Sequence, residues 1–168
     1  ERAEKNLQQA IALEDTLWQA HHLLGITYDR QQNYEGAVRQ YKKAISVKPN
    51  MAMLFNNLGM SFLLKGDYSE ALKSFSQASK LETSNDRVYN NIGLTLCKLG
   101  RYEEALEVFK KSGDEASAYN NLGYVFMIEG KNKEAIEAFE KALEIKPGFY
   151  TKAYENLKKA KNAHSSSP

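Results

Sequence analysis

Asparagine residues recur in pairs, each pair directly before Leu-Gly or Ile-Gly. The pairs are Asn56-Asn57, Asn90-Asn91 and Asn120-Asn121, and Asn156 repeats the second place of the pair. Asparagine is unfavourable inside a helix, because its side chain competes for backbone hydrogen bonds. A carboxamide carries a donor and an acceptor, which match the C=O and N–H groups of an extended peptide. The pairs therefore favour binding of a protein or an extended peptide.

The side chains that could carry out catalysis do not form a site in the sequence. His21 and His22 are adjacent, so in a helix they point to different faces and cannot bind one metal ion together. Cys97 has no histidine near it and is more typical of a packing residue than of a nucleophile. No glycine-rich loop follows a strand pattern to hold a phosphate. We expect no enzyme activity, no cofactor and no metal.

Composition excludes other classes of protein. The chain has 168 residues, with 23 Lys and Arg against 21 Asp and Glu, for a formal net charge of +2. This balance disfavours nucleic-acid binding and membrane-surface attraction, and no apolar run approaches the roughly 18 residues of a membrane span. The single Cys97 excludes an internal disulfide and leaves the compartment open between cytoplasm and bacterial periplasm or envelope. Because the chain begins at Glu1, we expect it to come from a longer protein.

The elements that would position the asparagines repeat along the chain every 34 residues. Three series keep this step together: a glycine series, an alanine series and an aromatic series, namely Gly25, Gly59 and Gly93; Ala37, Ala71 and Ala105; Tyr41, Phe75 and Phe109. Within each unit the apolar and small residues recur at helical spacing, which predicts two amphipathic helices joined by a tight turn. The small glycine in each first helix would allow the second helix to approach closely.

These residues resemble the tetratricopeptide repeat family, whose units of about 34 residues carry Leu-Gly, an aromatic, Ala, an aromatic, Ala and a closing Pro. Pro49 and Pro147 stand at the closing position, and Thr83 replaces the proline in between. The resemblance implies an all-α, right-handed superhelix over residues 1–163. We expect a half repeat at 1–15, full repeats at 18–51, 52–85, 86–115 and 116–149, a capping helix at 150–162, and a disordered tail at 164–168.

The repeat at 86–115 is shortened, because Gly123 follows Gly93 four positions sooner than Gly93 follows Gly59. Four residues are close to one turn of an α-helix. The loss falls between Phe109 and Tyr119, where Ser112-Gly113-Asp114 predicts a helix stop followed by a new N-cap. We therefore expect the helix that starts near Tyr102 to be one turn short.

In such a superhelix the first helices line the concave groove, where residues are free to bind a partner. The asparagines resemble the asparagine ladders, columns of Asn side chains along the groove, of some peptide-binding family members. By position the ladder would consist of Asn57, Asn91, Asn121 and Asn156. The preceding residues Asn56, Asn90 and Asn120 would lie beside it. Leu23 interrupts the ladder in the first full repeat. The alternative is that the amides bond neighbouring helices and only tie the repeats together.

Other residues share the groove face by the same periodicity. The apolar ones are Met53, Met60, Leu63, Leu64, Leu94, Tyr124, Met127 and Ile128, and the basic ones nearby are Arg87 and Lys98. Exposed apolar residues on one face are typical of a partner site. Some family members hold the acidic C-terminal tails of chaperones with a carboxylate clamp, in which Lys and Asn flank the Leu-Gly pair. That clamp is disfavoured here, because the residues that follow the glycines are Ile26, Met60, Leu94 and Tyr124.

We expect a non-catalytic scaffold that binds a protein or extended peptide in its groove. One alternative is a scaffold that assembles end to end through its terminal helices into a homo-oligomer. Another is an accessory domain of a larger enzyme. The stretch Ala118–Tyr124 is also similar to bacterial tetratricopeptide proteins of pilus assembly and secretion machinery, which would imply a partner in the cell envelope.

Overall fold

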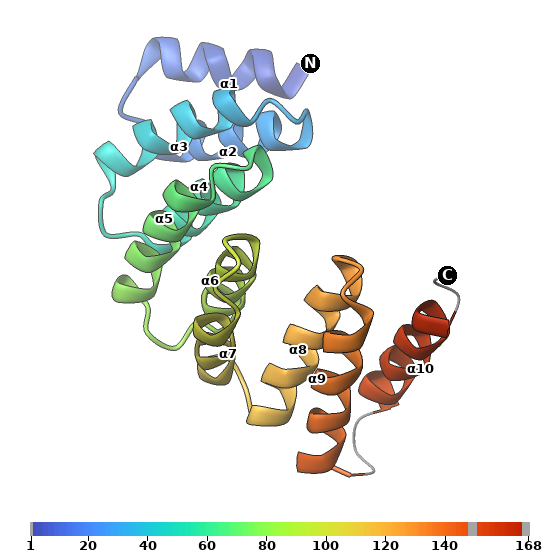
Figure 1. Cartoon of the computed structure of the whole chain (residues 1–168). Helices are drawn as coiled ribbons and strands as arrows, with labels where there is room; N and C mark the ends of the chain where they lie inside the picture. The colour runs from blue at the N-terminus through green and yellow to red at the C-terminus, as the bar shows by residue number, and fades with distance from the viewer. Residues whose placement is uncertain (1, 148–150, 166–168) are drawn as a thin grey trace. The chain divides into compact units, whose positions relative to one another are not determined.

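The structure is a computed structural model that describes residues 2–147 and 151–165, and within these ranges it has ten helices and no strand (Figure 1). The helices are α1 (Arg2–Leu13), α2 (Trp18–Arg30), α3 (Tyr34–Val47), α4 (Ala52–Lys65), α5 (Tyr68–Leu81), α6 (Asp86–Lys98), α7 (Tyr102–Lys111), α8 (Glu115–Ile128), α9 (Asn132–Ile145) and α10 (Thr151–Ser165). The all-α fold predicted from the repeated pattern is confirmed.

The chain divides into two compact units, Glu1–Asn91 and Ile92–Pro168, with the boundary inside α6. In unit 1, α2 packs against α3, α4 packs against α5, and α3 joins the two hairpins through its contact with α4. The helix α1 lies against α2. In unit 2, α8 packs against α7 and α9, and α10 packs against α9 and α8. A single solenoid over residues 1–163 stays a prediction.

Each helix hairpin is held by an aromatic ring that lies over a glycine. The ring of Phe75 is fully buried, and a Cβ atom placed on Gly59 would lie 2.7 Å from its Cδ1 and Cε1 atoms. Tyr41 covers Gly25 and Phe139 covers Gly123 in the same way. A larger side chain at the glycine would push the two helices apart. Close helix packing, and not a turn, therefore explains this glycine series.

A second glycine series ends the first helices of the repeats. Gly66, Gly100 and Gly130 have φ of 91°, 74° and 74°, which is the left-handed region that glycine enters without steric cost. Gln32 stands at the same place in the first full repeat and has φ of 59°. A side chain in this conformation costs about 1 kcal/mol. The first full repeat therefore keeps the turn at the expense of local strain.

The shortened repeat loses its missing residues from α7. This helix has 10 residues, whereas α3, α5 and α9 each have 14. It ends at Lys111, and Asp114 is the N-cap of α8. The predictions of one lost turn and of a helix stop followed by an N-cap are both confirmed.

Asp114 holds the start of α8 through three hydrogen bonds. Its Oδ1 accepts the backbone N–H of Ser117 at 2.8 Å and the Ser117 hydroxyl at 2.6 Å, and its Oδ2 accepts from Lys146 Nζ at 2.7 Å. These donors, Lys146 first, hold the pKa of the Asp114 carboxyl well below its ordinary value. The carboxylate therefore stays charged in the folded protein over the neutral and mildly acidic range.

Replacing Asp114 with alanine is expected to lower the free energy of unfolding of unit 2 by about 1 kcal/mol at neutral pH. Because folding lowers this pKa, the stabilisation is present above the ordinary carboxyl pKa of about 4 and is lost as the pH falls below it. Thermal unfolding at several pH values measures the difference. The control is Asp67→Ala, because Asp67 is the N-cap of α5 without a side-chain cap bond; an equal loss in both variants would contradict this role.

The C-terminal end of the chain differs from the prediction. The helix α10 continues to Ser165, so the expected disordered tail is wrong for His164 and Ser165, and residues 166–168 lie outside the described residues. Ala153, Leu157 and Ala160 of α10 are buried, the last two in a cluster with Ala135 and Phe139 of α9. At the other end, none of the residues of α1 is buried.

Candidate partner-binding site

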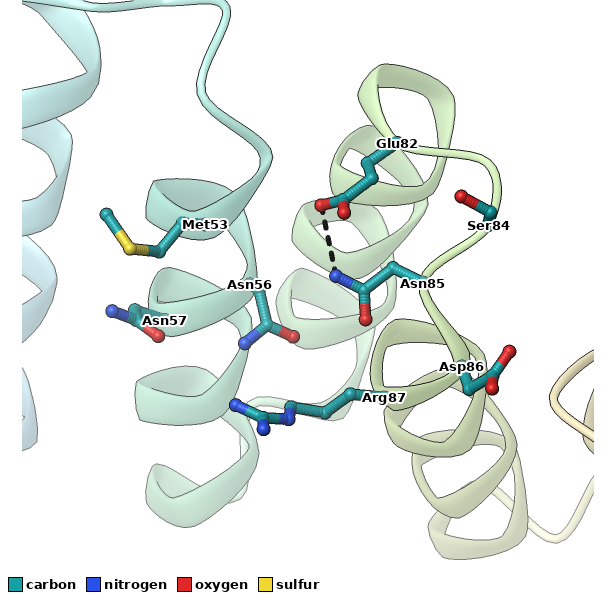
Figure 2. Close-up of a pocket in the computed structure, with 8 residues that line it drawn as sticks. All are labelled: Met53, Asn56, Asn57, Glu82, Ser84, Asn85, Asp86 and Arg87. Atoms are coloured by element: carbon teal, nitrogen blue, oxygen red, sulfur yellow. Dashed lines mark hydrogen bonds between the residues drawn. The ribbon is translucent and has the colours of Figure 1, made fainter.

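Unit 1 contains a hollow of about 510 Å³ between α4 and the segment that leads into α6 (Figure 2). Its lining residues are Met53, Asn56, Asn57, Glu82, Ser84, Asn85, Asp86 and Arg87. Three of them come from α4 at spacings of three and four residues, which places them on one face of that helix. The hollow thus joins two predicted groove asparagines with a predicted apolar residue, Met53, and a predicted basic residue, Arg87.

The asparagines of the hollow bond residues of the neighbouring repeats. Asn91 Nδ2 donates to Asn56 Oδ1 at 2.9 Å, and Asn57 Nδ2 donates to His22 Nε2 at 2.8 Å. In both pairs the first place of one repeat bonds the second place of the next repeat. These two contacts agree with the alternative that the amides tie repeats together.

This pairing fixes which side-chain atoms of the amides are left for a ligand. Asn56 uses its Oδ1 for Asn91, and Asn57 uses its Nδ2 for His22. Among the described residues, no hydrogen bond engages Nδ2 of Asn56 or Oδ1 of Asn57. The side chains border the hollow (Figure 2), so unit 1 presents one amide donor and one amide acceptor there, each held in orientation by a neighbouring repeat.

His22 orients Asn57 from the preceding repeat, a role that the sequence analysis did not assign to it. Its ring is half-buried, with its centroid 6.5 Å from that of Trp18 and 6.0 Å from that of Tyr41. Burial lowers its pKa, which favours the neutral imidazole that can accept from Asn57. The signal was available in the sequence, because His22 stands one full repeat before Asn56.

In unit 2 two of the three corresponding amides are covered. Asn120 and Asn156 are each 5% exposed, and neither Asn120 Oδ1 nor Asn156 Nδ2 has a hydrogen-bond partner among the described residues. The prediction placed both on an open groove face; they are buried, because α10 packs against α8 and α9. Asn121 of the same unit is half-buried, as are Asn90 and Asn91 of unit 1.

The remaining predicted groove residues do not line this hollow. Leu64, Tyr124 and Ile128 are 52%, 47% and 62% exposed, whereas Met60, Leu63 and Leu94 are half-buried. Met127 packs against the core cluster of unit 2 and is not an open groove residue. Lys98 is exposed and lies 3.9 Å from Glu129 Oε1. Their role in binding stays a prediction.

The candidate catalytic side chains are occupied or buried. His21 is 4% exposed, with Nδ1 2.7 Å from Gln40 Oε1 and Nε2 3.0 Å from the Asp15 carbonyl oxygen. Burial raises the pKa of the Cys97 thiol to about 12, which keeps it protonated and unreactive. Over residues 2–147 and 151–165, no group of three or more His, Cys, Asp or Glu side chains could hold a metal ion. Within the same ranges no helix is long and apolar enough to cross a membrane.

Family profiles match most of the sequence. The tetratricopeptide repeat profiles match residues 116–149 and 88–116, and a TPR repeat profile matches residues 30–66 and 60–100. The chain belongs to the tetratricopeptide repeat family. No curated protein matches it. As a tetratricopeptide repeat protein, it has the helix-pair architecture that its repeat period predicts.

Solved structures of other tetratricopeptide repeat proteins share this fold. The crystal structure of MamA is 23% identical, covers 94% of this chain and 89% of MamA, and has a TM-score of 0.72. YrrB, described as a TPR protein with an unusual peptide-binding site, is 23% identical over 96% of this chain and 83% of YrrB, with a TM-score of 0.72. PilF of Pseudomonas aeruginosa is 25% identical over 90% of this chain and 70% of PilF, with a TM-score of 0.63. They confirm the all-α tetratricopeptide solenoid.

Proposed function

We propose that this chain is a non-catalytic scaffold that binds an extended segment of a partner protein in the hollow of unit 1. The observation that carries the proposal is the pair of oriented amides: Asn56 offers an N–H and Asn57 offers a C=O to the hollow. An extended backbone presents the complementary C=O and N–H groups. Such contacts hold a chain without recognising its side chains.

Preorganisation is the physical basis of binding. Because Asn91 and His22 already hold the two amides, little side-chain entropy is lost when a ligand arrives. Met53 is 44% exposed at the same hollow, and its flexible thioether suits apolar ligand side chains of different shapes. YrrB, which has a peptide-binding site by its description, supports this use of the fold.

The test is binding to an array of random, uncharged peptides with blocked termini. The best binder is then titrated by fluorescence polarisation with the wild type, Asn57→Ala and the control Asn6→Ala, which changes an exposed asparagine of α1. We expect Asn57→Ala to weaken binding about tenfold, while Asn6→Ala binds like the wild type. Equal affinity of all three proteins would exclude the Asn57 amide from the site.

A second candidate function is end-to-end self-assembly. One observation favours it: α1 has no buried residue, and Leu13 at its end is 90% exposed. A second copy that packs against α1 would bury Leu13, and burial of an exposed apolar side chain favours association. Sedimentation velocity over a hundredfold range of protein concentration tests this candidate. A concentration-dependent mass would support it, and a constant monomer mass would exclude it.

A further inference from the structure

Arg87 brings a positive charge to the hollow. It is exposed in the first turn of α6, and its side chain extends toward α4 and ends beside Asn56 (Figure 2). Among the described residues no carboxylate forms an ion pair with Arg87, whereas Lys65 and Lys73 of the same unit pair with Asp67 and Glu70. A guanidinium presents a planar fork of N–H donors that fits a carboxylate.

Neither of the two acidic residues of the hollow forms an ion pair with Arg87 among the described residues. Glu82 Oε2 accepts from Asn85 Nδ2 at 3.0 Å. The carboxylate of Asp86 points away from Arg87 (Figure 2) and lies in the first turn of α6, where the helix dipole favours a negative charge. The lining therefore holds two carboxylates and a single guanidinium, so once one ligand carboxylate pairs with Arg87, a second ligand anion nearby would be repelled.

We infer that the hollow selects a segment with one acidic side chain flanked by neutral or basic residues, and that Arg87 holds this carboxylate. This inference rests on the proposed function. The Asn56 amide ends near the guanidinium in Figure 2; its nitrogen carries two N–H groups, so one contacts the ligand backbone and the other supplies a further donor to the carboxylate. Glu82 and Asp86 disfavour a run of acidic residues in the ligand, so the site selects a ligand with a single acidic side chain.

The experiment uses three peptides with blocked termini that differ only at their centre. They are built on the best uncharged binder and carry one glutamate, one glutamine, or three consecutive glutamates. Each is titrated by fluorescence polarisation against the whole chain, Arg87→Gln and the control Arg2→Gln, which removes an exposed arginine of α1. We expect the single-glutamate peptide to bind about tenfold more tightly than the other two.

The variants assign this preference to a residue. With Arg87→Gln the single-glutamate peptide should bind no more tightly than the glutamine peptide, while Arg2→Gln should keep the preference. Equal binding of the glutamate and glutamine peptides by the whole chain, a preference that survives Arg87→Gln, or tightest binding of the triple-glutamate peptide would each overturn the inference but not the proposed function. If no peptide of any kind binds, both are overturned.

Discussion

Replacing Gly59 with leucine should cost unit 1 about 3 kcal/mol of its free energy of unfolding. A Cβ atom alone would lie 2.7 Å from two ring atoms of Phe75, and leucine adds three further heavy atoms. The ring cannot move aside easily, because Phe75 is fully buried. Helix propensity would by itself favour leucine over glycine by about 1 kcal/mol, so a net loss reports packing between α4 and α5.

Urea unfolding followed by circular dichroism measures this loss. The control is Gly113→Leu, because Gly113 is exposed and its nearest neighbour would lie 3.4 Å from an added Cβ atom. We expect that variant to stay close to the wild type. Unchanged stability of the Gly59 variant would contradict the close approach of the two helices.

Replacing Phe139 with alanine should lower the free energy of unfolding of unit 2 by about 4 kcal/mol. Phe139 is fully buried in the cluster that joins α9 to α10. Removal of its ring leaves a cavity there and uncovers the face of Gly123. Peptide binding should change less than twofold in conditions where unit 1 stays folded, because every residue that lines the hollow belongs to unit 1.

Hydrogen exchange measured by NMR separates the two effects of this variant. Amide protons of α9 and α10 should exchange faster, while those of α4 and α5 keep their protection. A loss of protection throughout both units would contradict their description as separate compact bodies. Loss of peptide binding while unit 1 remains protected would contradict the assignment of the site to unit 1.

The fold was predictable because each of its determinants is local and repeated. A glycine in the first helix and an aromatic in the second, as in Gly59 and Phe75, mark one packed hairpin. The four residues missing before Gly123 could be assigned to α7, because an N-cap followed at Asp114. The turn at Gln32 is the exception. A glycine there would have predicted the left-handed backbone conformation, whereas glutamine does not.

The site was only partly predictable, because it depends on contacts between repeats. The asparagine pairs were visible, but the bond from Asn57 to His22 joins residues of different types in different repeats. In the sequence His22 was considered only as a metal ligand or catalytic residue and set aside, and nothing in its residue type indicated an acceptor for an amide. The burial of Asn156 depends on how α10 packs against α9 and α8. The Asn-Leu pattern of the terminal helix does not predict this packing.

The central claim is that the free N–H of Asn56 contacts the ligand, and Asn56→Asp tests it most directly. Aspartate keeps an oxygen to accept from Asn91 and removes the N–H, so the bond between repeats is retained while the proposed ligand contact is lost. The measurement is the affinity for the best uncharged peptide. This peptide has no acidic side chain for Arg87 to hold, so an ion pair between the introduced aspartate and Arg87 affects its binding least. We predict about tenfold weaker binding at unchanged thermal stability. Unchanged affinity at unchanged stability would show that Asn56 only joins the repeats and does not contact the ligand.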